Sequence, residues 1–162
     1  VLTTDDKRTF LRGGYYSRTF HNDTLTVLSL NTVLYSGYFE PTPSNENGDS
    51  DDDPGRQFSW MRTVLGNCRE RGTQAMIVGH IPPAVGSFRH TQLWKDAYIQ
   101  TYYEIVKEFD NVITAQLFGH LHSDEFRVGL ADYEGGSDST TNYSMIPSMN
   151  TPILLGPSIT PL

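Results

Sequence analysis

Residues 112–122 read VITAQLFGHLH, and this stretch decides the fold that we expect. Its first seven residues form an apolar run of strand length, which ends in a glycine and two histidines spaced two residues apart. A second apolar run, AMIV at 75–78, leads in the same way into GHIPP. His80 therefore follows its strand as His120 follows the other, and ligands in α/β folds gather at the carboxyl ends of strands.

Strand and helix patterns alternate on either side of these two runs. LTVLSLN at 25–31 is a further predicted strand, and YYSRTF at 15–20 is its expected hairpin partner, with the turn at 21–23. A helix is predicted to start at Asp53-Pro54, with Asp53 as its N-cap, and to end near Gly72. Apolar residues recur at helical spacing both there and in a second predicted helix over 91–109: Phe58, Met61, Leu65 and Cys68, then Trp94, Tyr98, Tyr102, Ile105 and Phe109. This alternation predicts an α/β fold with helices packed on a sheet.

The composition limits the class of protein. The 162 residues carry 12 Lys and Arg against 19 Asp and Glu, and the net charge of −7 argues against nucleic-acid binding. That length suits one domain, and no apolar run reaches the ~18 residues that a transmembrane segment needs. Cys68 is the single cysteine, which excludes an internal disulfide and a cysteine-based zinc site. The chain begins at Val1 rather than Met, and we expect it to be a piece of a longer protein.

Three of the five histidines occupy positions that suit metal binding, because neutral imidazole binds Zn²⁺, Fe and Mn-type ions. If the backbone after Phe118 stays extended, His120 and His122 point the same way. If it turns, which Gly119 would permit, each can face a different ion. A single histidine beside a strand is more often a hydrogen-bonded core or surface residue, so the metal interpretation rests on His80, His120 and His122 together. His21 and His90 lack this context.

Other chemistries find little support in the sequence. No G-x-S-x-G elbow is present, and no glycine-rich phosphate loop follows a strand. Asn22 and Asn142 each begin an N-x-S/T sequon, which fits an N-glycosylated surface turn and passage through a secretory pathway. The acidic segment from Ser44 to Asp53 contains nothing to bury and is expected to be poorly ordered.

GHIPP around His80 and AQLFGHLHSDEF around His120 and His122 resemble the C-terminal signature of the calcineurin-like metallophosphoesterases. Within that superfamily the chain is similar, over nearly its whole length, to the acid sphingomyelinase-type phosphodiesterases. The similarity also includes FLRGGYYS, LSLNT, DPGRQFSWM and LLGPSITPL. FLRGGYY and LSLNT are similar to endopolyphosphatases too, but their final motif tends to carry Asn where this chain has His122.

The resemblance implies a four-layer α/β/β/α sandwich with two divalent metal ions at the strand ends, zinc foremost, with Mn or Fe as alternatives. It implies that His80 and His120 bind one ion and His122 the other, and that water activated by the two ions attacks phosphorus. The family's D-x-H, GD and GNH motifs, which supply its remaining ligands, are absent from these 162 residues. Residues 1–162 therefore resemble the C-terminal half of the catalytic domain, and the N-terminal half would be its missing partner.

The function implied by the resemblance is a metal-dependent phosphodiesterase that acts on a phospholipid headgroup ester such as sphingomyelin, releasing ceramide and phosphocholine. Such a protein would be secreted, lysosomal or vacuolar. The alternatives are an endopolyphosphatase-like or nucleotide-phosphodiesterase-like hydrolase, and a non-catalytic module that keeps the fold for binding or assembly. In the family the GD motif supplies the aspartate that bridges the two metal ions. Because this motif is absent, we expect the chain alone to be inactive. Because the N-terminal half is absent as well, we expect the chain to expose apolar surface.

Overall fold

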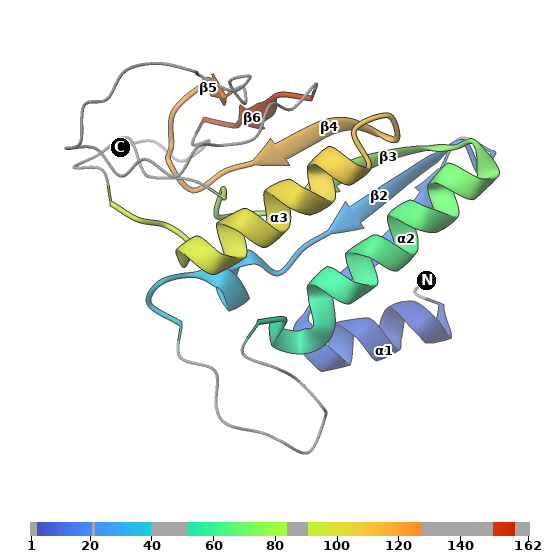
Figure 1. Ribbon diagram of the computed structural model, residues 1–162, viewed down its shortest axis with the longest axis horizontal. Helices are drawn as coiled ribbons and strands as arrows, with labels where there is room; N and C mark the ends of the chain where they lie inside the picture. Colours follow the sequence, from blue (N-terminus) through green and yellow to red (C-terminus); the bar gives the residue numbers. More distant parts are fainter. Residues whose placement is uncertain (1–2, 21, 40–51, 84–90, 128–150, 158–162) are drawn as a thin grey trace.

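A computed structural model describes residues 3–20, 22–39, 52–83, 91–127 and 151–157. They form an α/β fold around one six-stranded sheet in the order β1-β2-β3-β4-β6-β5 (Figure 1). The strands are β1 (Tyr16–Phe20), β2 (Leu25–Ser29), β3 (Gln74–Val78), β4 (Ile113–Phe118), β5 (Glu125–Arg127) and β6 (Ile153–Leu155). The four central strands, β2, β3, β4 and β6, run parallel, and β1 and β5 pair antiparallel at the two ends of the sheet.

The predicted hairpin is confirmed. β1 and β2 pair in register from Tyr16 opposite Ser29 to Phe20 opposite Leu25. Asn22 and Asp23 both have positive φ, 53° and 66°, in the tight turn that a short hairpin requires.

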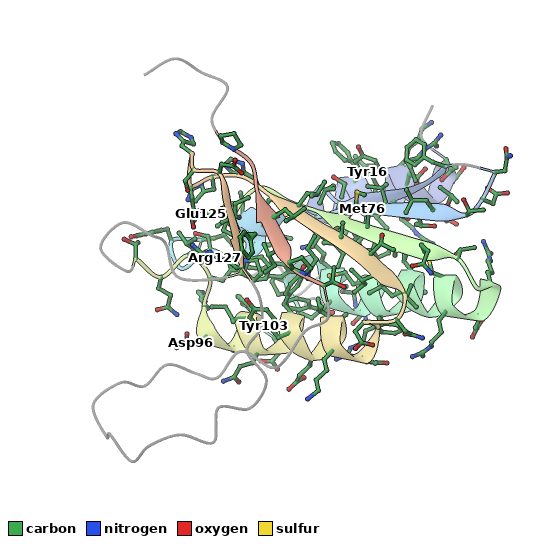
Figure 2. All side chains as sticks on the ribbon, turned by 90° about the horizontal axis from the view of Figure 1, so that it is seen from above. Tyr16, Met76, Asp96, Tyr103, Glu125 and Arg127 are labelled. Atoms are coloured by element: carbon green, nitrogen blue, oxygen red, sulfur yellow. The ribbon has the colours of Figure 1, made fainter. Side chains whose placement is uncertain are left out.

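Helices α2 (Gln57–Arg71) and α3 (Asp96–Glu108) lie side by side on one face of the sheet (Figure 1). The apolar faces predicted for them are confirmed, because every residue of both sets is buried. Figure 2 shows the two helices on one side of the sheet, with Tyr103 on α3. Cys68 is buried among the apolar residues, as expected of a structural thiol.

The predicted helix start at Asp53-Pro54 is confirmed in part, and the predicted start at Thr91 is wrong. Asp53 does not directly precede α2, because the 3₁₀ turn η3 (Pro54–Arg56) intervenes and Gly55 takes φ 64°. The Asp53 carboxylate still caps α2 across this turn, accepting from the N–H groups of Phe58 at 2.7 Å and Ser59 at 3.0 Å. The second helix begins at Asp96 rather than Thr91, because the segment before it pairs with another loop: Trp94 bridges Ser36.

One helix has no counterpart in the sequence interpretation. Helix α1 (Thr4–Gly13) packs beside β1 and begins with a capping box, in which the Asp6 N–H donates to the Thr3 hydroxyl and the Thr3 N–H donates to the Asp6 carboxylate. The T-x-x-D pattern is the sequence signal that would have predicted this helix start.

Three of the motifs that carry the family resemblance meet through hydrogen bonds that are buried or partly buried. Asn31 follows β2 and is the N-cap of the short 3₁₀ helix η1 (Thr32–Tyr35). Its side-chain amide donates to the Gly13 carbonyl at 2.9 Å. The Gln57 side chain accepts from the Asn31 N–H at 2.8 Å and donates to its carbonyl at 3.1 Å. The Tyr15 hydroxyl donates to the Gly55 carbonyl at 2.7 Å. These motifs therefore hold α1, β2 and α2 together.

The face of the sheet opposite α2 and α3 carries a row of apolar side chains across four strands. Register pairing places Val78, Leu117, Leu154 and Phe126 side by side, and we call this set the open-face row. Leu117 is 36% exposed, Leu154 41% and Phe126 72%, so the residues described leave much of this row uncovered. No helix in the described ranges is long and apolar enough to cross a bilayer. The predicted disorder of Ser44–Asp53 falls, except for Asp52 and Asp53, outside those ranges.

Candidate metal centre

The two histidine-bearing strand ends are neighbours. β3 and β4 are parallel partners, and their hydrogen bonding continues past the last strand residues: the Gly79 N–H donates to the Leu117 carbonyl and the Gly119 N–H to the His80 carbonyl, each at 3.0 Å. His80 and His120 therefore lie at the same edge of the sheet, which is the edge where α/β folds place their ligands.

The two imidazole rings approach each other closely. His120 Nδ1 lies 3.3 Å from His80 Nε2, and the ring centroids are 5.1 Å apart at an interplanar angle of 83°. Both side chains are exposed, while Ile81 and Phe118 beside them are buried. The two exposed imidazole rings are therefore attached to strand ends whose neighbouring residues are buried.

The ring separation suits a shared metal ion. Two nitrogens bound at about 2.0–2.1 Å to one tetrahedral ion lie about 3.3 Å apart, so the observed separation, which is also that of a hydrogen bond between the two rings, fits a shared ion. Partial burial lowers the pKa of His120, and the adjacent His80 and His122 lower this pKa further. A lowered pKa keeps the imidazole neutral, which is the form that binds a metal.

The backbone after β4 turns sharply, and the turn falls on the histidines themselves. His120 has φ 72° and His122 φ 56°, both in the left-handed region. The Leu121 N–H donates to the Gly119 carbonyl at 2.9 Å, which closes a γ-turn centred on His120. Gly119 was the residue expected to permit this turn, but it does not have positive φ. Strained backbone of this kind in non-glycine residues is concentrated at functional sites.

His122 lies just beyond this turn and is exposed. It is close enough to influence the pKa of His120, but it does not join His80 and His120. Among the residues that the structure describes, no group of three His, Cys, Asp or Glu side chains is arranged to hold one metal ion. The structure thus brings together two of the three predicted ligands and leaves the third apart.

Of the two glycines that precede His80 and His120, one allows the close approach of the strand ends. A Cβ atom at Gly79 would lie 2.8 Å from Phe118 Cε1 and 2.8 Å from Thr32 Cγ2, which is closer than side chains can tolerate. A Cβ at Gly119 would lie 3.6 Å from His80 Nδ1, an ordinary contact. Gly79 is therefore the position where the absence of a side chain matters for the site.

Three residues that support the site were not predicted from the sequence to have this role. Thr32, Trp94 and Tyr103 are buried and hydrogen-bond to the backbone of the segment after His80. Trp94 and Tyr103 are part of aromatic-rich segments that predict core, and Thr32 stands in LSLNT without any ionisable group. No local pattern distinguishes them.

The two glycosylation candidates differ in what can be said of them. Asn22 is exposed in the hairpin turn, with Asp23 and Thr24 exposed beside it, so this sequon is accessible. Asn142 lies outside the described residues, as do His21 and His90.

Comparison with known proteins identifies phosphodiesterases and endopolyphosphatases among the chain's relatives. The chain is 34% identical over 138 residues to sphingomyelinase phosphodiesterase D of Dictyostelium discoideum, a match that covers 85% of the chain and 28% of that protein. It is 30% identical over 147 residues to the human cyclic GMP-AMP phosphodiesterase SMPDL3A, covering 90% of the chain and 30% of the relative. A Cryptococcus neoformans endopolyphosphatase is 29% identical over 160 residues, which is 98% of the chain and 22% of the relative. No protein-family model matches the chain.

The α/β fold and these relatives, which are named phosphodiesterases and endopolyphosphatases, identify the chain as a member of the metallophosphoesterases. Within that class the chain belongs to the acid sphingomyelinase-like phosphodiesterases. It spans less than a third of the length of the two sphingomyelinase-like relatives described above.

Proposed function

We propose that this chain carries part of the dinuclear metal centre of a phosphodiesterase, with His80 and His120 as ligands of one divalent ion and His122 as a ligand of the second. The observation that carries the proposal is the 3.3 Å separation of His80 Nε2 and His120 Nδ1 at the ends of two adjacent parallel strands. Residues 1–162 would then form the C-terminal half of the catalytic domain.

Divalent ions at this edge, with zinc foremost and Mn or Fe as alternatives, would neutralise phosphate oxygens and lower the pKa of a bound water. The chain's own contribution is to present neutral imidazoles in a fixed arrangement. The strand ladder fixes His80 against Gly119, and the γ-turn directs His120 toward His80. Because both rings are exposed, a phosphate group can approach them from solvent.

We propose a phospholipid headgroup ester of the sphingomyelin type as the substrate, cleaved to ceramide and phosphocholine. Support comes from the name of the Dictyostelium relative and from His122, which stands where endopolyphosphatases tend to carry Asn. Polyphosphate and a cyclic dinucleotide are the rival substrates, in line with the names of the other two relatives. A non-catalytic binding or assembly module remains the rival outside the hydrolases.

The exposed Asn22 sequon supports a glycoprotein that is secreted, lysosomal or vacuolar. Mass spectrometry of the secreted protein, with Asn22→Gln and Asn142→Gln variants as controls, would show whether either sequon carries a glycan.

The metal site can be tested on the 162-residue chain by titration with Co²⁺, which reports tetrahedral nitrogen coordination through its visible absorption. We expect binding that His80→Ala and His120→Ala each weaken by tenfold or more. His122→Ala, the matched control, should change this first binding event by less than threefold. Equal binding by the wild type and the His80→Ala variant would refute the shared site.

Activity is tested with bis(p-nitrophenyl) phosphate and with sphingomyelin vesicles, in the presence of Zn²⁺ or Mn²⁺. We expect the 162-residue chain to be inactive and activity to appear when the upstream half of the domain is supplied, because the other ligand motifs are absent from these residues. Turnover by the chain alone that His122→Ala abolishes would show that the half-site suffices. Upstream D-x-H, GD and GNH motifs in the parent sequence would separate an enzyme from a non-catalytic module.

A further inference from the structure

The segment that follows His80 is held by hydrogen bonds from four separate parts of the chain. The His80 carbonyl accepts from the Gly119 N–H at 3.0 Å, and the Ile81 N–H donates to the Thr32 hydroxyl at 2.8 Å. The Ile81 carbonyl accepts from Trp94 Nε1 at 3.0 Å, and the Pro83 carbonyl accepts from the Tyr103 hydroxyl at 2.8 Å. Residues 81–83 are therefore buried and held in place, and the exposed His80 directly precedes them.

Thr32 contacts this segment with both branches of its side chain. Its hydroxyl accepts from Ile81, directly after His80, across 49 residues of sequence. Its methyl carbon lies 2.8 Å from the position that a Cβ of Gly79 would occupy, and Gly79 directly precedes His80. Thr32 is 1% exposed, so water cannot replace its hydroxyl as the acceptor for the Ile81 N–H. One buried side chain therefore contacts the residues on both sides of His80.

Trp94 holds Ile81 from its other backbone group, the carbonyl. Its indole N–H is the donor to the Ile81 carbonyl, and the side chain is fully buried. Trp94 is held in turn by its bridge to Ser36, which lies four residues after Thr32 in the sequence. The two partners of the Ile81 backbone thus belong to segments that pair with each other: Thr32 holds the peptide unit between His80 and Ile81, and Trp94 holds the next one, between Ile81 and Pro82.

We propose that Thr32, supported by Trp94, is a positioning residue for the metal pair: it fixes the peptide after His80 and thereby sets the distance between the His80 and His120 rings. The inference rests on the proposed function, in which these rings share one divalent ion. Preorganised ligands need buried supports of this kind, because a ligand on a loose loop would lose its alignment with the second ligand.

The test uses a pair of substitutions at Thr32 and a matched control. Thr32→Val keeps the shape and the methyl group but removes the acceptor, and Thr32→Ser keeps the hydroxyl. Thr151→Val removes another buried threonine hydroxyl, which donates to the Ile113 carbonyl at 2.8 Å at the other end of β4. Thr151→Val therefore reports the effect of losing a buried hydrogen bond away from the histidines.

Two readouts are measured on the 162-residue chain: Co²⁺ affinity, and the nuclear Overhauser effect between the protons of the His80 and His120 rings without metal. We expect Thr32→Val to weaken Co²⁺ binding about tenfold and to reduce the Overhauser effect at least twofold. Thr32→Ser should restore both to within about threefold of the wild type, and Thr151→Val should leave both unchanged.

The two proposals fail in different ways. If the wild type binds Co²⁺ no better than the His80→Ala variant, the metal site is refuted, and the Overhauser effect still tests the positioning role. If Thr32→Val leaves both readouts at wild-type values, or if Thr151→Val reduces them equally, the positioning role of Thr32 is overturned while the metal site stands.

Discussion

Gly79 shows how a single missing side chain determines the geometry at the strand ends. It lies between Phe118, the last residue of β4, and Thr32, the acceptor for Ile81. A Cβ here would lie 2.8 Å from both side chains and must displace them, and Thr32 is the side chain that holds Ile81, the residue after His80. The requirement for glycine is one of space, because Gly79 does not take positive φ.

We therefore predict that Gly79→Ala lowers the free energy of unfolding by about 1–3 kcal/mol, the usual cost of overpacking a filled core. Urea denaturation measures this change. Gly66→Ala is the matched control, because a Cβ at Gly66, within α2, meets no atom within 4 Å. It should raise stability by about 0.5–1 kcal/mol, since alanine favours a helix interior over glycine. Equal effects at the two glycines would contradict the steric account.

Asp6 provides a pH-dependent contribution to stability at the start of α1. Burial alone would raise its pKa, but hydrogen bonds with Thr3 and the charge of Arg18, 3.6 Å away, outweigh burial and lower the pKa. A carboxylate whose folded pKa is lowered stabilises the fold above its unfolded pKa of about 3.9. That contribution is lost as the pH falls through the folded value.

Asp6→Asn keeps an acceptor for the Thr3 N–H but removes the negative charge near Arg18 and the helix N-terminus, and it should cost about 0.3–1 kcal/mol of stability at pH 7. The gap between wild type and variant should narrow below about pH 4, where the carboxylate becomes protonated. Denaturation at pH 7 and pH 3 measures both values. Asp5→Asn, at an exposed ion pair with Arg8, should change stability by less than about 0.5 kcal/mol. A gap that stays constant with pH would show that Asp6 acts without its charge.

At the scale of elements, a buried polar chain connects α3, β4 and the segment leading into β6. The Tyr102 hydroxyl donates to Gln116 Oε1 at 2.7 Å, and Gln116 Nε2 donates to the Thr151 carbonyl at 2.9 Å. Gln116 is fully buried, so no solvent can substitute for either partner. These two hydrogen bonds specify which residues of β4 and β6 lie opposite each other beneath α3.

Gln116→Leu should therefore cost about 2–4 kcal/mol, because it leaves the Tyr102 hydroxyl and the Thr151 carbonyl buried without partners. Adding Tyr102→Phe should cost less in this background than in the wild type, because it removes one of the two orphaned groups. A double-mutant cycle from urea denaturation gives the coupling energy. Strict additivity would show that the two side chains act independently.

Much of this architecture could be predicted from local pattern. The hairpin, the strands before His80 and His120, and the buried faces of α2 and α3 follow from apolar periodicity, which the core enforces. The start of α3 could not be predicted, because Trp94 fits the helical stripe but is committed to its bridge with Ser36. A turn after Phe118 was one of the two predicted alternatives, but its position on His120 and His122 could not be predicted, because glycine is the ordinary residue for left-handed backbone and Gly119 lies beside them. The contact of His80 with His120 follows from strand order, which a single sequence does not encode locally.

For the molecule as a whole, the sheet is covered by helices on one face and carries the open-face row on the other. An apolar row of this kind normally marks a surface that another layer covers. The resemblance to a four-layer sandwich agrees with such a layer, and the chain matches only 28% of its Dictyostelium relative. The free surface and the strand edges should favour self-association of the isolated chain.

We predict that Leu154→Thr combined with Phe126→Thr shifts the purified chain toward monomer, because it removes the two most exposed members of the row. Sedimentation velocity at several concentrations measures the shift. Leu11→Thr, at an exposed apolar residue on α1 away from the row, is the control and should leave association unchanged. An unaltered sedimentation profile in the double variant would show that the row does not drive association.

The backbone contacts of residues 80–83 also have an evolutionary consequence. The peptide after His80 is anchored at Ile81 and again at Pro83, both to buried partners. Because Ile81 and Pro83 are both held in place, a change in chain length beyond Pro83 should not shift the His80 imidazole. Insertions and deletions there can accumulate without disturbing the paired rings, so lineages could diversify what they recognise while inheriting one unchanged pair of ligands.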